Sequence, residues 1–424
     1  FGGPQGIIGI ERAIDHIASH LNLDPIEVRT INFYRSGTLL KGNLQKPQTT
    51  PYGMPVVDSI STEITETLLK TANYKSRLEA IKAWNKDNSI IKKGIALSPV
   101  KFGISFTLTH LNQAGAIVNV YTDGSVYLNH GGTEMGQGLF IKVAQIAAET
   151  FGIGIDRIKI SATDTAKVPN TSATAASSGA DLNGMATKIA CRKIVNRIRK
   201  VLSKENKISE DQIIFENGNI LIGTKLISFT EGVLIAYQNR VSLSSTGYYA
   251  TPELFWDRKT GVGRPFFYFS YGAAITEVAV DTLTGETNFL RADILHDCGR
   301  SLNPAIDLGQ IEGGYIQGLG WLTTEELVWD KSGTLKTFAP STYKIPCASD
   351  RPKVLNIELW DAPNRLDTVY NSKAVGEPPL ILGISAWLAI SNAISQCGTQ
   401  YPHLNTPATP EEILKAIDRA RNGV

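Results

Sequence analysis

Cysteine is scarce in this chain of 424 residues, and its spacing matches no familiar cysteine site. The four cysteines, Cys191, Cys298, Cys347 and Cys397, stand far apart, and no CxxC pair occurs. A zinc ribbon, a four-cysteine iron–sulfur centre and a disulfide scaffold are therefore not expected. The spacing favours reduced, mostly buried thiols, as in a cytoplasmic protein.

The sequence also lacks a charge excess and a long apolar run. Its 42 basic and 40 acidic residues give a net charge of +2, which provides no electrostatic reason to bind nucleic acid or an anionic membrane. No apolar run approaches the roughly 18 residues that span a bilayer. The first residues show neither the basic nor the apolar region of a secretory signal. We therefore expect no nucleic-acid partner, no membrane segment and a cytoplasmic location.

Metal-binding and nucleotide-binding motifs are not evident either. His110, His130 and His296 stand apart in sequence, so a metal centre with protein ligands is not expected. Neither a Walker A motif nor GxGxxG is present. The function must therefore be sought in less regular patterns.

The patterns that are present predict an α+β protein. The length favours two or three domains, and strands, hairpins and helices alternate without a fixed repeat. "AIVNVYTDGSVYLNH" reads as a β-hairpin, and strands are expected on both sides of residues 281–286 and 330–334. Helices are expected at about 5–21, 62–84, 139–151 and 181–203, after residue 304, after residue 377 and in the tail, where Thr409 and Glu412 form a capping box.

Glycine is the abundant residue, and three stretches rich in glycine or hydroxyl groups lie at predicted helix starts. They are residues 131–138, 170–179 and 309–314. Helix N-termini offer free N–H groups, and glycine allows a ligand to approach the backbone closely. Each stretch alone is explained better as a tight packing turn, but the three together indicate a large anionic cofactor.

Glu377 in "SKAVGEPPL" is the sharpest single candidate. Pro378 disfavours helical geometry at Glu377, and two prolines stiffen the start of the next helix. A rigidly held carboxylate is a candidate general base, and the alternative is a helix-capping glutamate. Other candidates have equally plain alternatives: Phe106 as a core residue on a strand, Gln137 as an exposed first-turn residue, and Gln310 and Glu312 as partners of their neighbours.

Seven stretches taken together resemble one family. "FGGPQG", "KFGISFT", "LNQAGAIVNVYTDGSVYLNHGGTEMGQG", "VPNTSATAAS", "DILHDCGRSLNPAIDLGQIEG", "PSTYKIP" and "SKAVGEPPL" resemble, in order, the xanthine dehydrogenase family of molybdenum hydroxylases. "GYYATPELFWDRKTGVGRPFFYFSYGAA" is similar to the bacterial type of molybdopterin subunit. The resemblance runs along nearly the whole chain and implies an elongated molybdopterin-binding domain of mixed sheets and helices.

The resemblance implies a cofactor and a reaction. Molybdenum is held by the dithiolene of molybdopterin and takes no protein ligand. A glutamate deprotonates Mo–OH, the oxygen attacks a purine carbon, and hydride passes to Mo=S, so that hypoxanthine and xanthine become urate with water as the oxygen source. Electrons then leave through two [2Fe–2S] clusters and FAD to NAD⁺, all bound outside this chain.

The same resemblance assigns residues. Glu377 is the base, and Gly376 adjoins the cofactor. Gly136, Gln137, Ser177 and Gln310 contact the pterin, and Ala176 lies against the molybdenum centre. Phe106 stacks on one face of the purine, and Phe1 meets the purine edge-on or from the other side. Thr107 bonds the purine, and Leu111 lines its pocket.

The resemblance also implies partners. The iron–sulfur region, the FAD region and part of the first molybdopterin region are expected as partners, within a higher oligomer, and the isolated piece is expected to be inactive. Residues 1–90 are expected to end a first molybdopterin-binding domain, 91–400 to form the second, and 401–424 to form a tail helix. The alternatives are an aldehyde oxidase or another N-heterocycle hydroxylase, or a non-catalytic cofactor-binding or assembly module.

Overall fold

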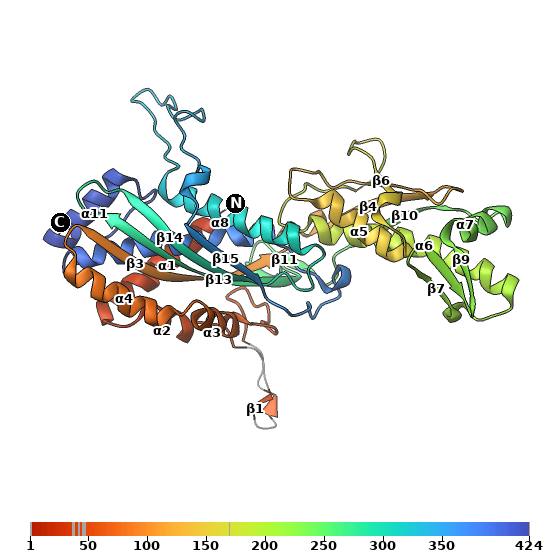
Figure 1. Cartoon of the computed structure of the whole chain (residues 1–424), viewed down its shortest axis with the longest axis horizontal. Coiled ribbons are helices and arrows are strands. Elements are labelled where there is room, and N and C mark those ends of the chain that lie inside the picture. Colours follow the sequence, from red (N-terminus) through yellow and green to blue (C-terminus); the bar gives the residue numbers. More distant parts are fainter. Residues whose placement is uncertain (1, 36–38, 41–42, 45–47, 169, 424) are drawn as a thin grey trace.

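The computed structural model describes residues 2–35, 39–40, 43–44, 48–168 and 170–423. The predicted mixture of helices and sheets is confirmed. Two lobes lie end to end along the long axis of an elongated molecule (Figure 1). Phe1 lies outside the described residues, so its predicted contact with the purine stays a prediction.

The first lobe is built on a four-stranded sheet with the order β15-β14-β13-β3. Its strands are β3 (Ile91–Ile104), β13 (Tyr268–Asp281), β14 (Thr287–His296) and β15 (Val354–Leu359). The β13–β14 hairpin was predicted and is confirmed, whereas β15 joins β14 as a parallel strand. The sheet thus combines neighbouring and distant segments of the chain.

Helices cover both faces of this sheet. Alternate residues of β13 point to opposite faces, so each face contributes apolar side chains to the packing. Ala274 and Val278 pack with α8 (Pro304–Thr323) and α10 (Ile384–Ile394). Ala273 and Ile275 pack with the helices of the opposite face. Burial on both faces explains why "YFSYGAAITEVAV" is almost continuously apolar.

The opposite face carries α3 (Ser61–Thr71) and α4 (Tyr74–Asp87). The sequence predicted one helix over 62–84, and this prediction is wrong. Asn73 takes a left-handed conformation with φ of 52° and separates the two helices, as asparagine does more readily than most residues.

Three further helices complete the first lobe. They are α1 (Gly3–Leu21), α2 (Pro25–Ile31) and α11 (Pro410–Asn422). The side chain of Asp24 caps α2 by accepting the N–H of Ile26 at 2.8 Å. In α11 only half of the predicted capping box forms, because the Glu412 carboxylate accepts the N–H of Asn405 instead of that of Thr409.

One segment, residues 378–397, is long and apolar enough to cross a membrane, with a mean hydropathy of 1.5. It comprises α9 (Pro378–Ile381), α10 and a final 3₁₀ turn. The sequence expectation that no such run exists is therefore wrong. Because 72% of this segment is buried inside the protein, its apolar character is explained by packing on β3 and β13.

The second lobe has its own four-stranded sheet, in the order β10-β4-β5-β6. The strands are β4 (Gln113–Val120), β5 (Val126–His130), β6 (Ile158–Ile160) and β10 (Ser244–Ala250). Its helices are α5 (Leu139–Phe151) and α6 (Gly179–Asn206), both predicted, which share an apolar core with the sheet. α6 lies very close to β10, since a Cβ on Gly247 would stand 1.9 Å from the carbonyl oxygen of Ala186.

The far end of the second lobe is a small three-stranded sheet with one helix (Figure 1). These elements are β7 (Ile213–Glu216), β8 (Asn219–Ile222), β9 (Lys225–Ser228) and α7 (Phe229–Gln238). Two short hairpins remain: β1 (Leu39–Leu40) with β2 (Asn43–Leu44), and β11 (Phe255–Asp257) with β12 (Val262–Arg264). The strands predicted around 330–334 are wrong, because the described chain has only an isolated bridge there, between Trp329 and Leu335.

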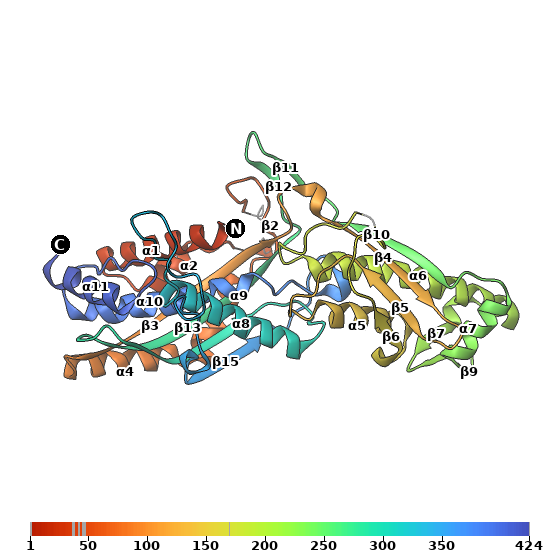
Figure 2. The ribbon, with the colours of Figure 1, turned by 90° about the horizontal axis from the view of Figure 1, so that it is seen from above.

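The chain passes between the lobes several times, as the view from above shows (Figure 2). One passage links β3 to β4 through residues 105–112, and another links β10 to β13 through residues 251–267. Segments from distant parts of the sequence therefore meet where the lobes join.

Candidate active site

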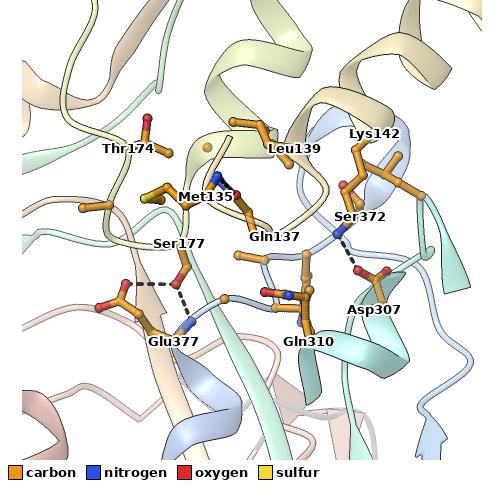
Figure 3. A pocket seen from close by; sticks show the side chains of 18 residues that line it. Met135, Gln137, Leu139, Lys142, Thr174, Ser177, Asp307, Gln310, Ser372 and Glu377 are labelled. Atoms are coloured by element: carbon orange, nitrogen blue, oxygen red, sulfur yellow. Dashed lines mark hydrogen bonds and ion pairs between the residues drawn. The ribbon is translucent and has the colours of Figure 1, made fainter. Parts of the chain in front are cut away.

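A pocket of about 400 Å³ lies where the two lobes meet (Figure 3). Four segments line it, and each precedes or begins a helix. Residues 135–142 belong to α5 and its preceding loop, 174–180 to α6 and its loop, 302–310 to α8, and 372–377 lead into α9. Five residues singled out from the sequence share this lining: Gln137, Ser177, Gln310, Gly376 and Glu377.

The other described candidates lie outside this lining. Gly136 and Ala176 are neighbours of lining residues. Phe106, Thr107 and Leu111 belong to the passage between β3 and β4, because β3 ends at Ile104. The prediction that Phe106 lies on a strand is therefore wrong.

The loop that carries Phe106 is held by one buried side chain, Asn112. Its Oδ1 accepts the N–H of Phe106 at 2.8 Å, and its Nδ2 donates to the carbonyl oxygen of Phe106 at 2.9 Å. Phe106 itself is half-buried, and Thr107 is exposed. The loop is thus a defined turn with its aromatic residue at a fixed position.

Glu377 does not cap the helix that follows it. It has helical backbone angles, φ −79° and ψ −37°, although Pro378 disfavours them, and its side chain makes no capping bond to α9. Instead, the Ser177 hydroxyl donates to Glu377 Oε2 at 2.9 Å, and the N–H of Glu377 donates to Ser177 Oγ at 2.7 Å (Figure 3). The capping alternative fails, and the carboxylate stays available to the pocket.

The backbone around Ser177 has an uncommon conformation. Ala176 and Ser177 have φ of 54° and 56°, which residues other than glycine, asparagine and aspartate rarely adopt. A Cβ on Gly376 would stand 3.0 Å from Ser177 Oγ. The absence of a side chain at Gly376 therefore allows this close approach of the two segments.

The loop before α5 is organised differently, around Glu134. Its carboxylate accepts the N–H groups of Gly136 at 2.9 Å, Gly138 at 3.0 Å and Phe140 at 2.9 Å. Burial acts to raise the pKa of Glu134, but the backbone donors outweigh it, so this pKa lies below its ordinary value. The N–H groups that the sequence offered to an external anion are thus bound by an internal one.

The loops before α5 and α6 also contact each other. The N–H of Thr133 donates to Thr174 Oγ1 at 2.9 Å, and a Cβ on Gly131 would stand 2.0 Å from Thr171 Oγ1. Gly131 is therefore explained by packing. The contact joins both loops into one wall of the pocket.

Buried polar groups hold the segment that leads to Glu377. Lys373 Nζ donates to Asp297 Oδ2 at 2.6 Å. The Tyr268 hydroxyl accepts the N–H of Ala374 at 2.7 Å and donates to Asp181 Oδ2 at 2.7 Å. Burial raises the pKa of Asp181 to about 7, against the lowering effects of Tyr268 and a nearby lysine. These bonds tie residues 373 and 374 to both lobes.

An ion pair forms the far wall of the pocket. Lys142 Nζ donates to Asp307 Oδ1 at 2.5 Å, and the Ser301 hydroxyl donates to Asp307 Oδ2 at 2.5 Å. Sequence reasoning missed Lys142, although a single cation in the apolar helix "LFIKVAQIAAETF" is a usable signal. It also missed Tyr268, Asp297 and Lys373, whose spacing in sequence gives no such signal.

The pocket fits a cofactor with polar and anionic groups. Among the described residues, no side chain caps the start of α6, and this uncapped start, with its partial positive charge, lies on the pocket lining at Gly179 and Ala180. The volume lies within the usual range for ligand sites.

Within the described ranges, no group of three or more His, Cys, Asp or Glu side chains is placed to hold a metal ion. Sequence reasoning overlooked one histidine pair, His16 and His20, at HxxxH spacing on α1. The His16 ring stacks on Tyr401 at 4.3 Å and meets His403 edge-on at 4.9 Å. These rings line a separate pocket at the end of the first lobe.

Comparisons with known proteins identify the family of this chain. A molybdopterin cofactor-binding domain model matches residues 67–352, and a second model of the same description matches residues 1–33. The chain belongs to the molybdopterin cofactor-binding family, as its sequence predicted.

Within this family the chain is similar to xanthine dehydrogenases. It is 43% identical to the xanthine dehydrogenase of Dictyostelium discoideum over 422 residues, covering 97% of the chain and 29% of that protein. It is also 43% identical to the xanthine dehydrogenase/oxidase of Gallus gallus over 422 residues, covering 98% of the chain and 29% of that protein. The chain thus corresponds to the molybdopterin-binding portion of xanthine dehydrogenase-type oxidoreductases and spans less than a third of their length.

Solved structures share the fold. Carbon monoxide dehydrogenase from Oligotropha carboxidovorans superposes with a TM-score of 0.83 at 21% identity, covering 98% of this chain and 51% of that one. At this identity the likeness concerns the fold alone. It agrees with the predicted elongated arrangement of sheets and helices.

Proposed function

We propose that this chain is the molybdopterin-binding and catalytic part of a xanthine dehydrogenase that hydroxylates hypoxanthine and xanthine to urate, with water as the oxygen source. The observation that carries the proposal is the position of Glu377. Its carboxylate lies on the lining of the one pocket that also contains Gln137, Ser177, Gln310 and Gly376. These residues are separated by up to 240 positions in sequence (137 to 377), and each was expected at the cofactor.

Molybdopterin would be held by the walls of this pocket. Gln310 offers an amide group from α8, Gly376 allows a close approach, and the uncapped start of α6 suits an anionic group. The Gln137 oxygen accepts the N–H of Met135 and its nitrogen donates to the carbonyl oxygen of Thr133, so Gln137 would meet the cofactor through its remaining amide hydrogen. When bound, this cofactor supplies two-electron redox chemistry. No protein side chain is needed as a metal ligand, since the pterin dithiolene fills that role.

Glu377 acts as the general base. Its Oε2 accepts the Ser177 hydroxyl, while Oε1 has no donor among the described residues. Oε1 is thus available to accept a proton from the oxygen nucleophile. General bases contribute about 10²–10⁴-fold to rates when they are held in reach of the proton.

The purine is bound by the passage between β3 and β4. The ring of Phe106 provides a flat surface for a heterocycle, and such pairs add about 0.5–1.5 kcal/mol beyond burial. Thr107 and Leu111 lie on the same turn and contribute a hydroxyl and an apolar contact. Phe1 is proposed as the second aromatic wall.

Further parts of the enzyme complete the reaction. Two [2Fe–2S] clusters and FAD, bound outside this chain, carry electrons to NAD⁺ in a cytoplasmic, higher-oligomeric assembly. The division into 1–90, 91–400 and 401–424 as parts of successive molybdopterin-binding domains belongs to the same proposal. The isolated chain is expected to be inactive.

Replacing Glu377 in the assembled enzyme tests the base. We expect Glu377→Gln to lower kcat for xanthine by about 10³-fold, because Gln cannot accept a proton, while molybdenum and pterin contents stay unchanged. Glu358→Gln, an exposed residue of β15, serves as the matched control. Unchanged xanthine oxidation in the Glu377 variant would refute the base assignment.

Substrate class is tested with the unmodified enzyme. We expect a higher kcat/KM for hypoxanthine and xanthine than for an aromatic aldehyde or quinoline. A preference for the aldehyde or for quinoline would replace the purine proposal by an aldehyde oxidase or an N-heterocycle hydroxylase. Molybdenum-loaded enzyme without activity on any of the three classes would indicate a non-catalytic module.

A further inference from the structure

Ser177 makes two hydrogen bonds to the same residue of the other lobe. Its Oγ accepts the N–H of Glu377 at 2.7 Å and donates to Glu377 Oε2 at 2.9 Å. The backbone N–H and the carboxylate of Glu377 are therefore both bonded to one hydroxyl, which fixes the side chain relative to its own backbone (Figure 3).

The surrounding backbone holds this hydroxyl in place at a conformational cost. Ala176 and Ser177 are both left-handed, an arrangement that persists only where neighbouring contacts determine it. Asp181, one turn further along α6, is bonded through Tyr268 to the N–H of Ala374. The start of α6 is thus attached twice to the segment that carries Glu377.

A serine hydroxyl has one proton and two acceptor positions. The proton is given to Glu377, and one acceptor position takes the N–H of Glu377. Ser177 Oγ can therefore accept a hydrogen bond from a cofactor but cannot donate one without releasing the carboxylate.

We infer that Ser177 is a positioning residue for Glu377: its hydroxyl fixes the carboxylate so that Oε1 faces the pocket, and it meets the cofactor only as an acceptor. This inference rests on the proposed function of Glu377 as the base. It adds to that function the contact that orients the base and a direction for the contact between Ser177 and the pterin.

The test uses Ser177→Ala in the assembled enzyme, with Ser178→Ala as the matched control. The Ser178 hydroxyl donates to the carbonyl oxygen of Ala175 and does not contact Glu377. We expect Ser177→Ala to lower kcat about 10-fold, the equivalent of one lost hydrogen bond to a charged group, with KM changed less than 2-fold. The acidic limb of the kcat profile moves to higher pH, because the ionised carboxylate has lost a donor.

A second variant separates the hydroxyl from the backbone. Ser177→Gly also lacks the hydroxyl but adopts positive φ without strain. We expect it to match Ser177→Ala in kcat and in pH profile. If Ser177→Gly behaves like the unmodified enzyme, the hydroxyl has no positioning role.

The double variant with Glu377→Gln distinguishes the two proposals. If Ser177 acts through Glu377, Ser177→Ala has no further effect on kcat in the Glu377→Gln enzyme. An equal loss in both backgrounds, or loss of pterin content in Ser177→Ala, would assign Ser177 to cofactor binding instead. Full activity of Glu377→Gln alone would overturn the proposed base, whereas an inactive Glu377→Gln with an unaffected Ser177→Ala would overturn only the positioning inference.

Discussion

The loops before α5 and α6 look alike in sequence, yet they meet the pocket in different ways. Both are rich in glycine and hydroxyl groups, and both precede a long helix of the second lobe. In the first, Glu134 binds the N–H groups of its own loop. In the second, Ser177 reaches across to Glu377 in the other lobe. The comparison shows that such composition predicts a helix start with available donors but does not say whether the chain itself uses them.

The acidic side chains near these two helix starts, Glu134 and Asp181, have pKa values shifted in opposite directions. Backbone donors hold the pKa of the exposed Glu134 below its ordinary value. Burial raises the pKa of Asp181 to about 7, although it lies in the first turn of α6. The first loop is therefore stabilised by a charge, and the second by a carboxyl group that favours its neutral form.

The largest expected loss of stability comes from a variant that displaces α6 and leaves α5 in place. We expect Gly247→Ala to destabilise the protein by about 3 kcal/mol, because its Cβ would overlap the carbonyl oxygen of Ala186 in α6. The displaced helix directly follows the loop that carries Ser177, so pterin content and kcat should fall as well. Differential scanning calorimetry and pterin analysis of the assembled enzyme measure both effects.

The matched variant is Gly152→Ala, at the end of α5 away from its loop. Its Cβ would stand 2.4 Å from the backbone of Phe215, and its φ is 64°, so we expect a similar loss of stability. Pterin content per folded protein should stay unchanged in this variant. Equal losses of pterin in both variants would contradict the view that the position of α6 affects pterin binding beyond its effect on overall stability.

Much of the fold was predictable from periodicity. The hairpin at residues 113–130, the helices α5 and α6 and the hairpin at Asp281 follow from local patterns. The break at Asn73 was not predictable, because asparagine is compatible with a helix interior as well as with a left-handed residue. The pairing of β15 with β14 depends on a contact between distant segments, which periodicity does not encode.

The site was predictable in part. The family resemblance named Gln137, Ser177, Gln310 and Glu377, which meet in one pocket. Local sequence alone left Glu377 open between a general base and a capping residue, since its bond to Ser177 spans 200 positions. The supporting network of Tyr268, Asp181 and Lys373 was missed because its members are ordinary residues of a strand, a helix and a loop until the fold brings them together.

The second prediction concerns Asp181 and the pH dependence of stability. The folded pKa of Asp181, about 7, lies above its ordinary value of 3.8. The stability that the neutral carboxyl group provides is therefore fully present below pH 3.8 and is lost as pH rises through about 7. In the unmodified protein, we expect this titration to lower the free energy of unfolding by about 2 kcal/mol between pH 5 and 7. In Asp181→Asn this decrease should be absent. Asn keeps an oxygen that accepts the Tyr268 hydroxyl, so the fold is retained.

Thermal unfolding of the assembled enzyme from pH 5 to 8 measures this effect. Asp418→Asn, an exposed residue of α11, is the control and should leave the pH dependence unchanged. If Asp181→Asn is as pH-dependent as the unmodified protein, the carboxyl group is not the source of that dependence.

The smallest expected effect belongs to Glu134. Glu134→Gln leaves one oxygen for three N–H groups and places an amide donor near that of Phe140, so we expect a loss of about 1 kcal/mol at pH 7, as for a lost helix cap. Because the folded pKa of Glu134 lies below its ordinary value of 4.5, the stability it provides is present above that value and is lost as pH falls through the folded pKa. The free energy of unfolding of the variant should therefore differ most from that of the unmodified protein at neutral pH and least under acidic conditions.

Glu63→Gln is the matched control, because Glu63 lies in the first turn of α3 and is exposed. This control should lower the free energy of unfolding by no more than about 0.5 kcal/mol. Urea unfolding at pH 7 and pH 4 measures both variants, and equal losses for Glu63 and Glu134 would show that Glu134 acts through the helix dipole alone instead of as the bound anion of its loop.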